Sequence, residues 1–253
     1  MRNLTCILLM LVSGALYSQD TTVYNEPYGS ELSPDDEVSK GDFFLMFTVG
    51  VPSEDMKKAV KNQMGDLGFG LTIGFLSNPL SWGKNKMNSP FRIGGEIGYN
   101  YYGRFKNDYN INGYEGDFKT SYGILHTNVV LRLRPALPLK VSPFADVFGG
   151  GNFYLATIKE NFSAIESALG AEETDFGSPS SGSWVKGIGA GFSISGKKQD
   201  NPNFTFRATY TIGKEIKYVE RNSVMYDASS RSITYIEGRA PIRYWLVQVG
   251  ISI

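Results

Sequence analysis

The sequence contains very little cysteine: its 253 residues include one, Cys6. Cys6 lies in a short apolar run, residues 4–16, which follows the positive charge of Arg2 and precedes small residues up to Ser18. This pattern predicts a secretory signal peptide over residues 1–18. A retained signal anchor is the alternative, although the run is shorter than the ~20 residues of a membrane-spanning helix. Once the signal is removed, no thiol remains for a disulfide, thiol catalysis or a cysteine metal site.

Long hydrophobic runs and an excess of charge are also missing. Beyond residue 18 no apolar stretch approaches the ~20 residues that a membrane helix needs. Lys plus Arg and Asp plus Glu number 25 each, and removing residues 1–18 removes Arg2 alone, so no basic excess exists to attract nucleic acid. If the chain spans a membrane, it must use strands, because only helices and closed barrels satisfy every backbone amide in lipid.

Residues 19–40 have little potential for regular structure. They contain Pro27, Pro34 and a set of acids opposed only by Lys40: Asp20, Glu26, Glu31, Asp35, Asp36 and Glu37. We predict a flexible acidic leader here. The alternative is an acidic contact for a periplasmic partner.

The remainder, residues 41–253, contains eight segments in which apolar residues alternate with small or polar ones. They are 41–51, 67–77, 90–102, 121–134, 143–158, 184–196, 203–214 and 241–253. A strand alternates its faces with a period of two, so each segment has one apolar face. In the last segment, for example, Trp245, Val247 and Ile251 share a face opposite Gln248 and Gly250. The opposite row is rich in glycine and carries few of the Lys and Glu residues of a soluble exterior, which argues against a soluble calyx.

The lengths of the connections alternate along the chain. Long connections are expected at 52–66, 103–120, 159–183 and 215–240, and shorter ones at 78–89, 135–142 and 197–202. Bacterial barrels have long outer loops and short periplasmic turns. We therefore predict an all-β, eight-stranded antiparallel up-and-down transmembrane β-barrel. Helical spacing in 53–64 and 161–169 predicts two short loop helices, which either cover the barrel mouth or form a docking surface.

Two segments carry a family resemblance. They are Arg92–Tyr102 (RIGGEIGYNYY) and Ser142–Gly151 (SPFADVFGGG). With the signal ending near Ser18, they make the chain resemble the OmpA/OmpX-like eight-stranded outer-membrane barrels of the Bacteroidota type. The resemblance covers residues 41–253, implies residence in the cell outer membrane, and carries no catalytic residue.

Four charged residues occupy the strand positions that alternate with the apolar row and so face the barrel interior, which we call the inward parity. They are Glu96, Arg132, Asp146 and Arg207. An eight-stranded barrel has room inside for side chains and little else. Because an unpaired buried charge is costly, we predict that they form a structural ion-pair network. The alternative is a narrow gated path for a small solute.

Aromatic residues gather at one end of the predicted strands, where a girdle at the membrane boundary is expected. The girdle residues are Tyr99, Tyr101, Trp184, Tyr244 and Trp245, and Tyr102, Tyr122, Phe153 and Tyr154 lie at the same level.

His126 is the one histidine of the chain, and it also takes the inward parity. A lipid A-modifying enzyme could use it with a serine such as Ser121, but no spacing motif connects the two. We predict a non-enzymatic barrel without cofactor or metal, acting as a structural or accessory subunit that presents its loops to partner proteins. Its expected partners are outer-membrane lipid, lipopolysaccharide and another outer-membrane or periplasmic protein.

Overall fold

The computed structural model describes residues 41–60, 67–82, 89–111, 114–134, 140–161, 179–194, 202–220, 223–227 and 232–253. The predicted signal peptide (1–18) and acidic leader (19–40) lie outside the described residues. The second expected loop helix, 161–169, lies outside them beyond Asn161. None of the described helices is long and apolar enough to cross a membrane.

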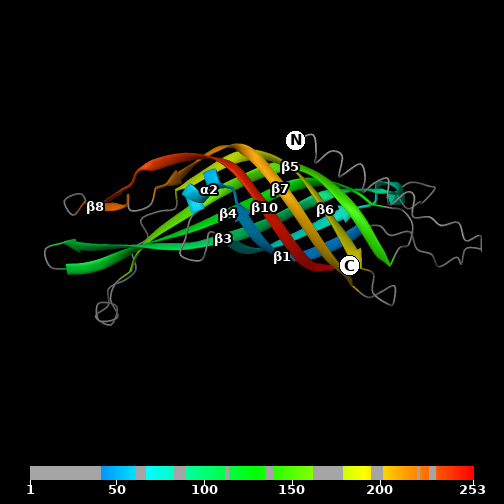
Figure 1. Cartoon of the computed structure of the whole chain (residues 1–253), viewed down its shortest axis with the longest axis horizontal. Coiled ribbons are helices and arrows are strands. Elements are labelled where there is room, and N and C mark those ends of the chain that lie inside the picture. Colours follow the sequence, from blue (N-terminus) through cyan, green and yellow to red (C-terminus); the bar gives the residue numbers. More distant parts are fainter. Residues whose placement is uncertain are drawn as a thin grey trace, which may run out of the picture. The chain divides into compact units, whose positions relative to one another are not determined.

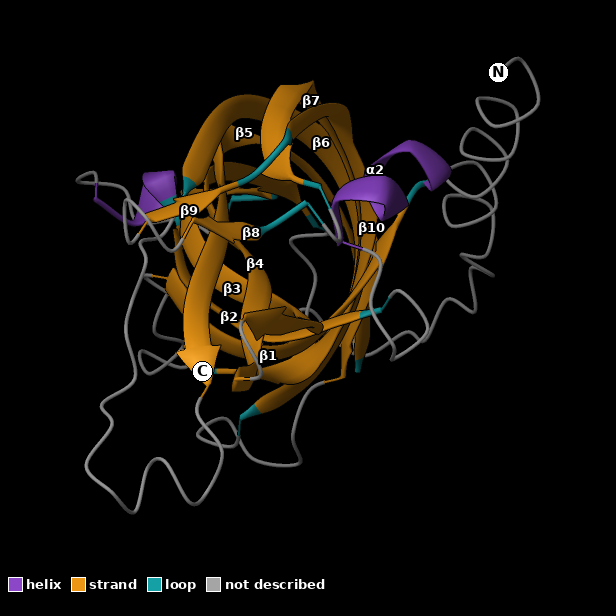
Figure 2. Ribbon diagram, turned by 90° about the vertical axis from the view of Figure 1, so that its left-hand side faces the viewer, coloured by secondary structure: helices purple, strands orange, loops and turns teal. Residues whose placement is uncertain are grey.

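Eight strands close into a barrel in which every neighbouring pair is antiparallel (Figures 1 and 2). They are β1 (Gly41–Pro52), β2 (Gly68–Ser77), β3 (Phe91–Ile111), β4 (Tyr114–Leu133), β5 (Val141–Asn161), β6 (Ser180–Ile194), β7 (Asn203–Val219) and β10 (Glu237–Ser252). Barrel strands that follow one another along the chain are neighbours in the sheet, and the last of them, β10, pairs with β1. The predicted strand count, closure and up-and-down order are confirmed. We call the end where β1 begins and β10 ends the turn end, and the opposite end the hairpin end.

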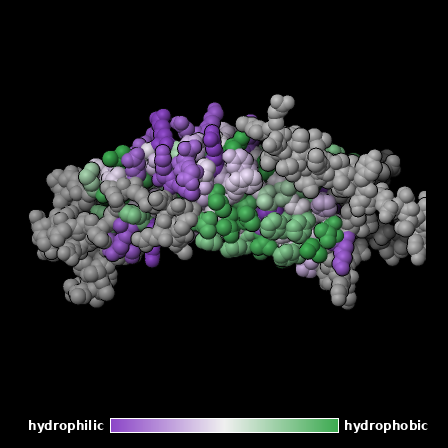
Figure 3. Space-filling model, viewed as in Figure 1, coloured by the Kyte–Doolittle hydropathy of each residue, from purple (hydrophilic) through white to green (hydrophobic). Residues whose placement is uncertain are grey.

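The apolar row of each strand faces outward, as predicted. Large apolar side chains on the outer surface include Phe47, Leu71, Ile97, Val129, Val147, Ile188, Phe204 and Val247. The alternate positions are buried, as the burial patterns of β1 and β10 show. On the face seen in Figure 3, apolar residues gather in one patch and hydrophilic residues lie beyond it.

The strands at the hairpin end are longer than predicted. Residues 103–120, expected to be an outer loop, are mostly strand, because β3 continues to Ile111 and β4 begins at Tyr114. The pairing shifts register between Tyr101 and Gly103, and Gly103 has a φ of 97°, which favours glycine at this bulge. The loop expected at 215–240 is also partly strand: β7 and β10 remain paired to Val219 and Glu237. The same segment holds a small separate hairpin of β8 (Met225–Asp227) and β9 (Ser232–Thr234).

A short helix, α2 (Glu54–Val60), follows β1 within the expected helical segment 53–64. Its seven residues are fewer than the ~12–15 that an isolated helix needs. Packing therefore holds it in place: Met56, Ala59 and Val60 are buried, and the Tyr154 hydroxyl donates to the Ala59 carbonyl at 3.1 Å. A single 3₁₀ turn, η1 (Pro79–Trp82), lies in the connection after β2.

Glycines of the inner row make space for large rings on neighbouring strands. A Cβ added at Gly74 would lie 2.3 Å from Phe44, and one added at Gly187 would lie 2.2 Å from Phe148. Gly191 is similarly close to Phe144. Glycine thus lets aromatic side chains fill a narrow interior without displacing the backbone.

Candidate functional site

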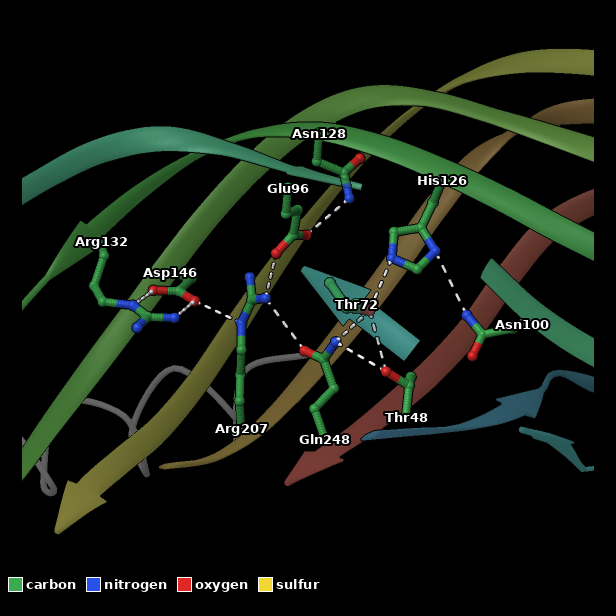
Figure 4. Close-up of polar contacts among 10 residues, drawn as sticks. All are labelled: Thr48, Thr72, Glu96, Asn100, His126, Asn128, Arg132, Asp146, Arg207 and Gln248. Carbon is green, nitrogen blue, oxygen red and sulfur yellow. Dashed lines mark hydrogen bonds and ion pairs between the residues drawn. The ribbon is translucent and has the colours of Figure 1, made fainter. Parts of the chain in front are cut away.

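A layer of polar side chains crosses the middle of the barrel interior (Figure 4). Its residues come from seven strands and are buried: Thr48, Thr72, Glu96, Asn100, His126, Asn128, Arg132, Asp146, Asn152, Arg207 and Gln248. All of them occupy the inward parity of their strands. We call this set the polar layer.

The structure brings the four predicted interior charges together. Arg207 lies between two acids, with its NH1 2.5 Å from Glu96 Oε2 and its Nε 2.6 Å from Asp146 Oδ2. Arg132 donates to both oxygens of Asp146, at 2.8 and 2.9 Å, in a bidentate pair. Two acids and two arginines thus balance within one buried cluster.

Neutral side chains extend this cluster to the other strands. Asn128 Nδ2 donates to Glu96 Oε1 at 2.9 Å, and Gln248 Oε1 accepts from Arg207 NH1 at 3.2 Å. Gln248 Nε2 in turn lies 3.2 Å from Thr72 Oγ1 and 3.4 Å from Thr48 Oγ1. The polar layer therefore links β1, β2 and β10 to the charged cluster on β3, β4, β5 and β7.

His126 lies at one edge of the polar layer and is fully buried. Its Nε2 is 3.3 Å from Thr72 Oγ1, and its Nδ1 is 3.5 Å from Asn100 Nδ2. The ring occupies the space left by Gly98, whose added Cβ would lie 2.4 Å from Nε2. Ser121 has the opposite parity on β4, so the structure does not bring the suggested serine and histidine together. Within the described residues, no group of three His, Cys, Asp or Glu side chains could hold a metal ion.

Two apolar clusters pack against the polar layer. One contains Phe44, Met46, Leu76, Val130 and Phe148, and its Val130–Phe148 pair lies next to the Arg132–Asp146 pair on β4 and β5. Toward the hairpin end, the side chains of α2 pack with inward residues that include Tyr102, Tyr122, Tyr154, Tyr244 and Leu246. Arg132 also stacks over Phe144, with its guanidinium carbon 3.7 Å from the ring centroid. The interior thus combines a polar layer with one apolar cluster interleaved with it and a second one toward the hairpin end.

The predicted aromatic girdle needs a correction at Tyr244. Tyr99, Tyr101, Trp184 and Trp245 are exposed on the outer surface, but Tyr244 is buried and its hydroxyl accepts from Asn152 Nδ2 at 2.5 Å. Adjacent residues of a strand face opposite sides, so Tyr244 and Trp245 cannot both point outward. For the same reason Tyr102, Tyr122 and Tyr154 lie inside, whereas Phe153 is exposed.

Sequence reasoning missed a second ionic group, at the turn end. Asp42 Oδ2 lies 3.1 Å from Arg134 NH1 and 3.8 Å from Arg92 Nε, and Arg92 is buried. Arg92 NH1 also donates to the Ser89 carbonyl at 3.3 Å. The sequence did contain a signal for this group. Asp42 and Arg92 both fall at inward positions of their strands, and Arg92 lies on the same face of β3 as Glu96.

Comparisons with known proteins give similar structures but no family. No family model matches the chain, and no curated protein matches it. The fold is similar to a major outer membrane protein from Thermus thermophilus, with 11% identity, a TM-score of 0.49 and coverage of 85% of this chain and 98% of that one. It is also similar to Neisserial surface protein A (11%, TM-score 0.41, coverage 85% and 97%). A third is Ail, the attachment invasion locus protein of Yersinia pestis (14%, TM-score 0.37, coverage 85% and 100%). The fold assignment rests on the strand pairing itself.

Proposed function

We propose that this chain is a non-enzymatic barrel of the bacterial outer membrane, acting as a structural or accessory subunit that presents its hairpin end to partner proteins. The observation that carries the proposal is the outer surface, where every strand of the closed barrel contributes to the apolar row. The resemblance to OmpA/OmpX-like barrels of the Bacteroidota type and the predicted signal peptide belong to the same proposal.

The distribution of apolar side chains favours a membrane. Soluble monomers rarely expose apolar patches larger than a few hundred Å². Here large apolar residues are exposed on all eight strands, with examples such as Leu71, Val129, Val147 and Ile188 each more than half exposed. An apolar outer band around a polar interior is the arrangement of membrane barrels. Lipid, including lipopolysaccharide, is therefore the proposed surrounding of this band.

The buried and paired side chains of the interior favour a barrel that does not conduct. An open solute path would need water between its walls, but Thr48, Thr72, His126, Asn152 and Arg207 are all fully buried. The charges are paired with one another, and buried apolar side chains pack among and above them. We therefore favour the structural ion-pair network over the narrow gated path.

The surroundings of His126 favour a structural role over catalysis. General acid–base chemistry needs a substrate within hydrogen-bond reach of the imidazole. Both ring nitrogens of His126 instead face neighbouring side chains, Thr72 and Asn100, inside the barrel wall. The histidine is therefore proposed to position those side chains.

The hairpin end is the proposed contact for a protein partner. There β3 and β4 continue as a paired ribbon to Ile111 and Tyr114, well past the last β2 pair at Tyr101. A backbone paired as a ribbon is a regular element, which suits docking better than a long irregular loop.

Gentle purification tests this proposal. The tagged full chain is extracted from fractionated outer membranes in mild detergent and analysed by mass spectrometry. We expect it in the outer-membrane fraction with a partner at fixed stoichiometry, and we expect the partner to be lost when residues 106–117 are replaced by a short turn. Recovery in the soluble fraction would contradict the membrane assignment, and a solitary barrel with enzymatic activity would contradict the accessory role.

A further inference from the structure

The outer wall of the barrel contains a groove within its apolar band. It has a volume of about 930 Å³ and crosses the outer surface between β2 and β6. Small outward residues form its floor: Gly95, Thr127, Gly149, Gly151 and Gly182. Ile73, Phe75 and Ile97 border it on one side, and Phe153 and Trp184 on the other.

Packing within the barrel does not explain three of these outward glycines: Gly95, Gly149 and Gly151. A Cβ added at Gly95 or Gly149 would meet nothing closer than 3.6 Å, and one at Gly151 nothing closer than 3.5 Å. Inner-row glycines differ, since an added Cβ at Gly70 or Gly98 would lie within 2.5 Å of another residue. The barrel could thus carry larger side chains in the groove, and their absence leaves space for something outside the chain.

A cation lies beside the groove. Cross-strand pairs connect Gly95 to Val129, Val129 to Gly149, and Gly149 to Lys186. Lys186 therefore flanks the groove at Gly149, and the groove continues past it to Trp184, nearer the hairpin end of β6. Lys186 is exposed and makes no ion pair within the described residues, and Trp184 lies two residues further along the same face. A second exposed cation, Lys214, lies on the neighbouring strand β7. It follows Gly213, which pairs with Val185, the residue before Lys186.

We propose that the groove binds an acyl chain of lipid A, with the phosphate of that lipid paired to Lys186. This rests on the proposed function and on the expectation that the long connections, which lie at the hairpin end, face the cell exterior. The apolar floor suits a hydrocarbon chain, and the exposed Trp184 suits the membrane boundary. The positive charge of Lys186 beside the groove favours an anionic headgroup, and phosphate-bearing lipid A supplies both parts in the outer leaflet.

The test measures binding of purified lipid A to the full-chain barrel by native mass spectrometry in mild detergent. Gly149→Leu/Gly151→Leu fills the groove without an internal clash, and Ala145→Leu on the same strand and face, outside the groove, is its control. Lys186→Gln removes the cation, and Lys140→Gln at the turn end is its control. Heat-modifiable migration in gels verifies that each variant is folded.

We expect the filled variant to weaken lipid A binding by about ten-fold or more, because each buried methylene contributes to membrane-lipid affinity. Lys186→Gln should weaken it about five-fold and remove any preference for phosphorylated over dephosphorylated lipid A. The controls should bind as the parent does.

Several outcomes would overturn this inference. Unchanged lipid A binding in the folded filled variant would do so, as would an equal loss in Ala145→Leu. Tighter binding of phosphatidylglycerol than of lipid A would do so too. A dimer of the parent that the filled variant abolishes would make the groove an interface between copies of the chain. Each of these leaves the outer-membrane assignment standing, whereas recovery of the chain in the soluble fraction would remove both proposals.

Discussion

Arg207 is the residue on which the charge balance of the interior depends. It contacts both acids of the polar layer, Glu96 and Asp146, and it is fully buried. Asp146 has a second cation in Arg132. Among the described residues, Glu96 is hydrogen-bonded to the amide of Asn128 and to Arg207 alone. Removing Arg207 therefore leaves Glu96 as a buried charge without a cationic partner.

We expect Arg207→Met to lower the free energy of unfolding by about 3–5 kcal/mol, the usual cost of breaking a buried ion pair from one side. Urea unfolding of the reconstituted barrel, followed by tryptophan fluorescence, measures this. Adding Glu96→Gln to the same variant should recover part of the loss, since the uncompensated charge is then gone. A double variant no more stable than Arg207→Met would show that the pair does not carry this energy.

Glycines of the two faces should respond differently to a methyl group. At Gly70 an added Cβ would lie 1.9 Å from the Tyr99 carbonyl oxygen, so Gly70→Ala should cost about 1–3 kcal/mol. At Gly149 the nearest atom is 3.6 Å away, so Gly149→Ala should stay within about 0.5 kcal/mol of the parent. The same urea titration compares them, and equal effects would contradict the assigned faces.

At the scale of elements, period-two alternation determines which face of a strand each residue takes. It placed Glu96, Arg132, Asp146 and Arg207 on the inward row from the sequence alone, because a strand in lipid must be apolar on one side. It could not show which of these charges meet, since that depends on the register between strands distant in sequence. Tyr244 was misassigned by following aromatic clustering instead of parity.

The ends of the strands were harder to predict than their centres. Beyond the apolar band both faces of a strand can be polar, so the alternation that marks β3 and β4 stops near Tyr101 and Ser121. Their backbone pairing nevertheless continues to Ile111 and Tyr114. The small hairpin of β8 and β9, with three residues in each strand, carries too few positions for any periodicity.

The helix α2 should stabilise the hairpin end through its buried face. Met56 is fully buried in the apolar cluster there, so Met56→Ala should cost about 2–5 kcal/mol. Lys58→Ala, on the exposed face of the same helix, is the matched control and should have little effect. The temperature at which the folded gel band disappears reports both variants. If Met56→Ala matches the control, α2 does not hold the cluster together.

At the scale of the whole molecule, the barrel differs in chemistry between its interior and its outer surface. The central charges are paired with one another and lie among buried side chains. The outer surface carries apolar side chains on all eight strands. This arrangement suits lipid outside and supports the proposal of a barrel that does not conduct.

We therefore expect the reconstituted barrel to show no discrete conductance steps in planar bilayers. The reason is that Arg207, Glu96 and Gln248 occupy the centre and bind one another. Stepwise currents in the parent that change size in Glu96→Gln would contradict this and restore the narrow solute path.

The most direct test of the central claim asks whether the apolar outer row faces lipid. Cys6 is the one native cysteine. Single cysteines are introduced in a Cys6→Ser background at Ile73 and Val129 on the outer row, and at Ile236, exposed beyond it. Intact outer membranes are then treated with a charged, water-soluble maleimide. The account predicts labelling at Ile236→Cys and protection at Ile73→Cys and Val129→Cys until detergent and a hydrophobic maleimide are added. Equal labelling of all three by the charged reagent in intact membranes would mean that water, not lipid, surrounds the barrel.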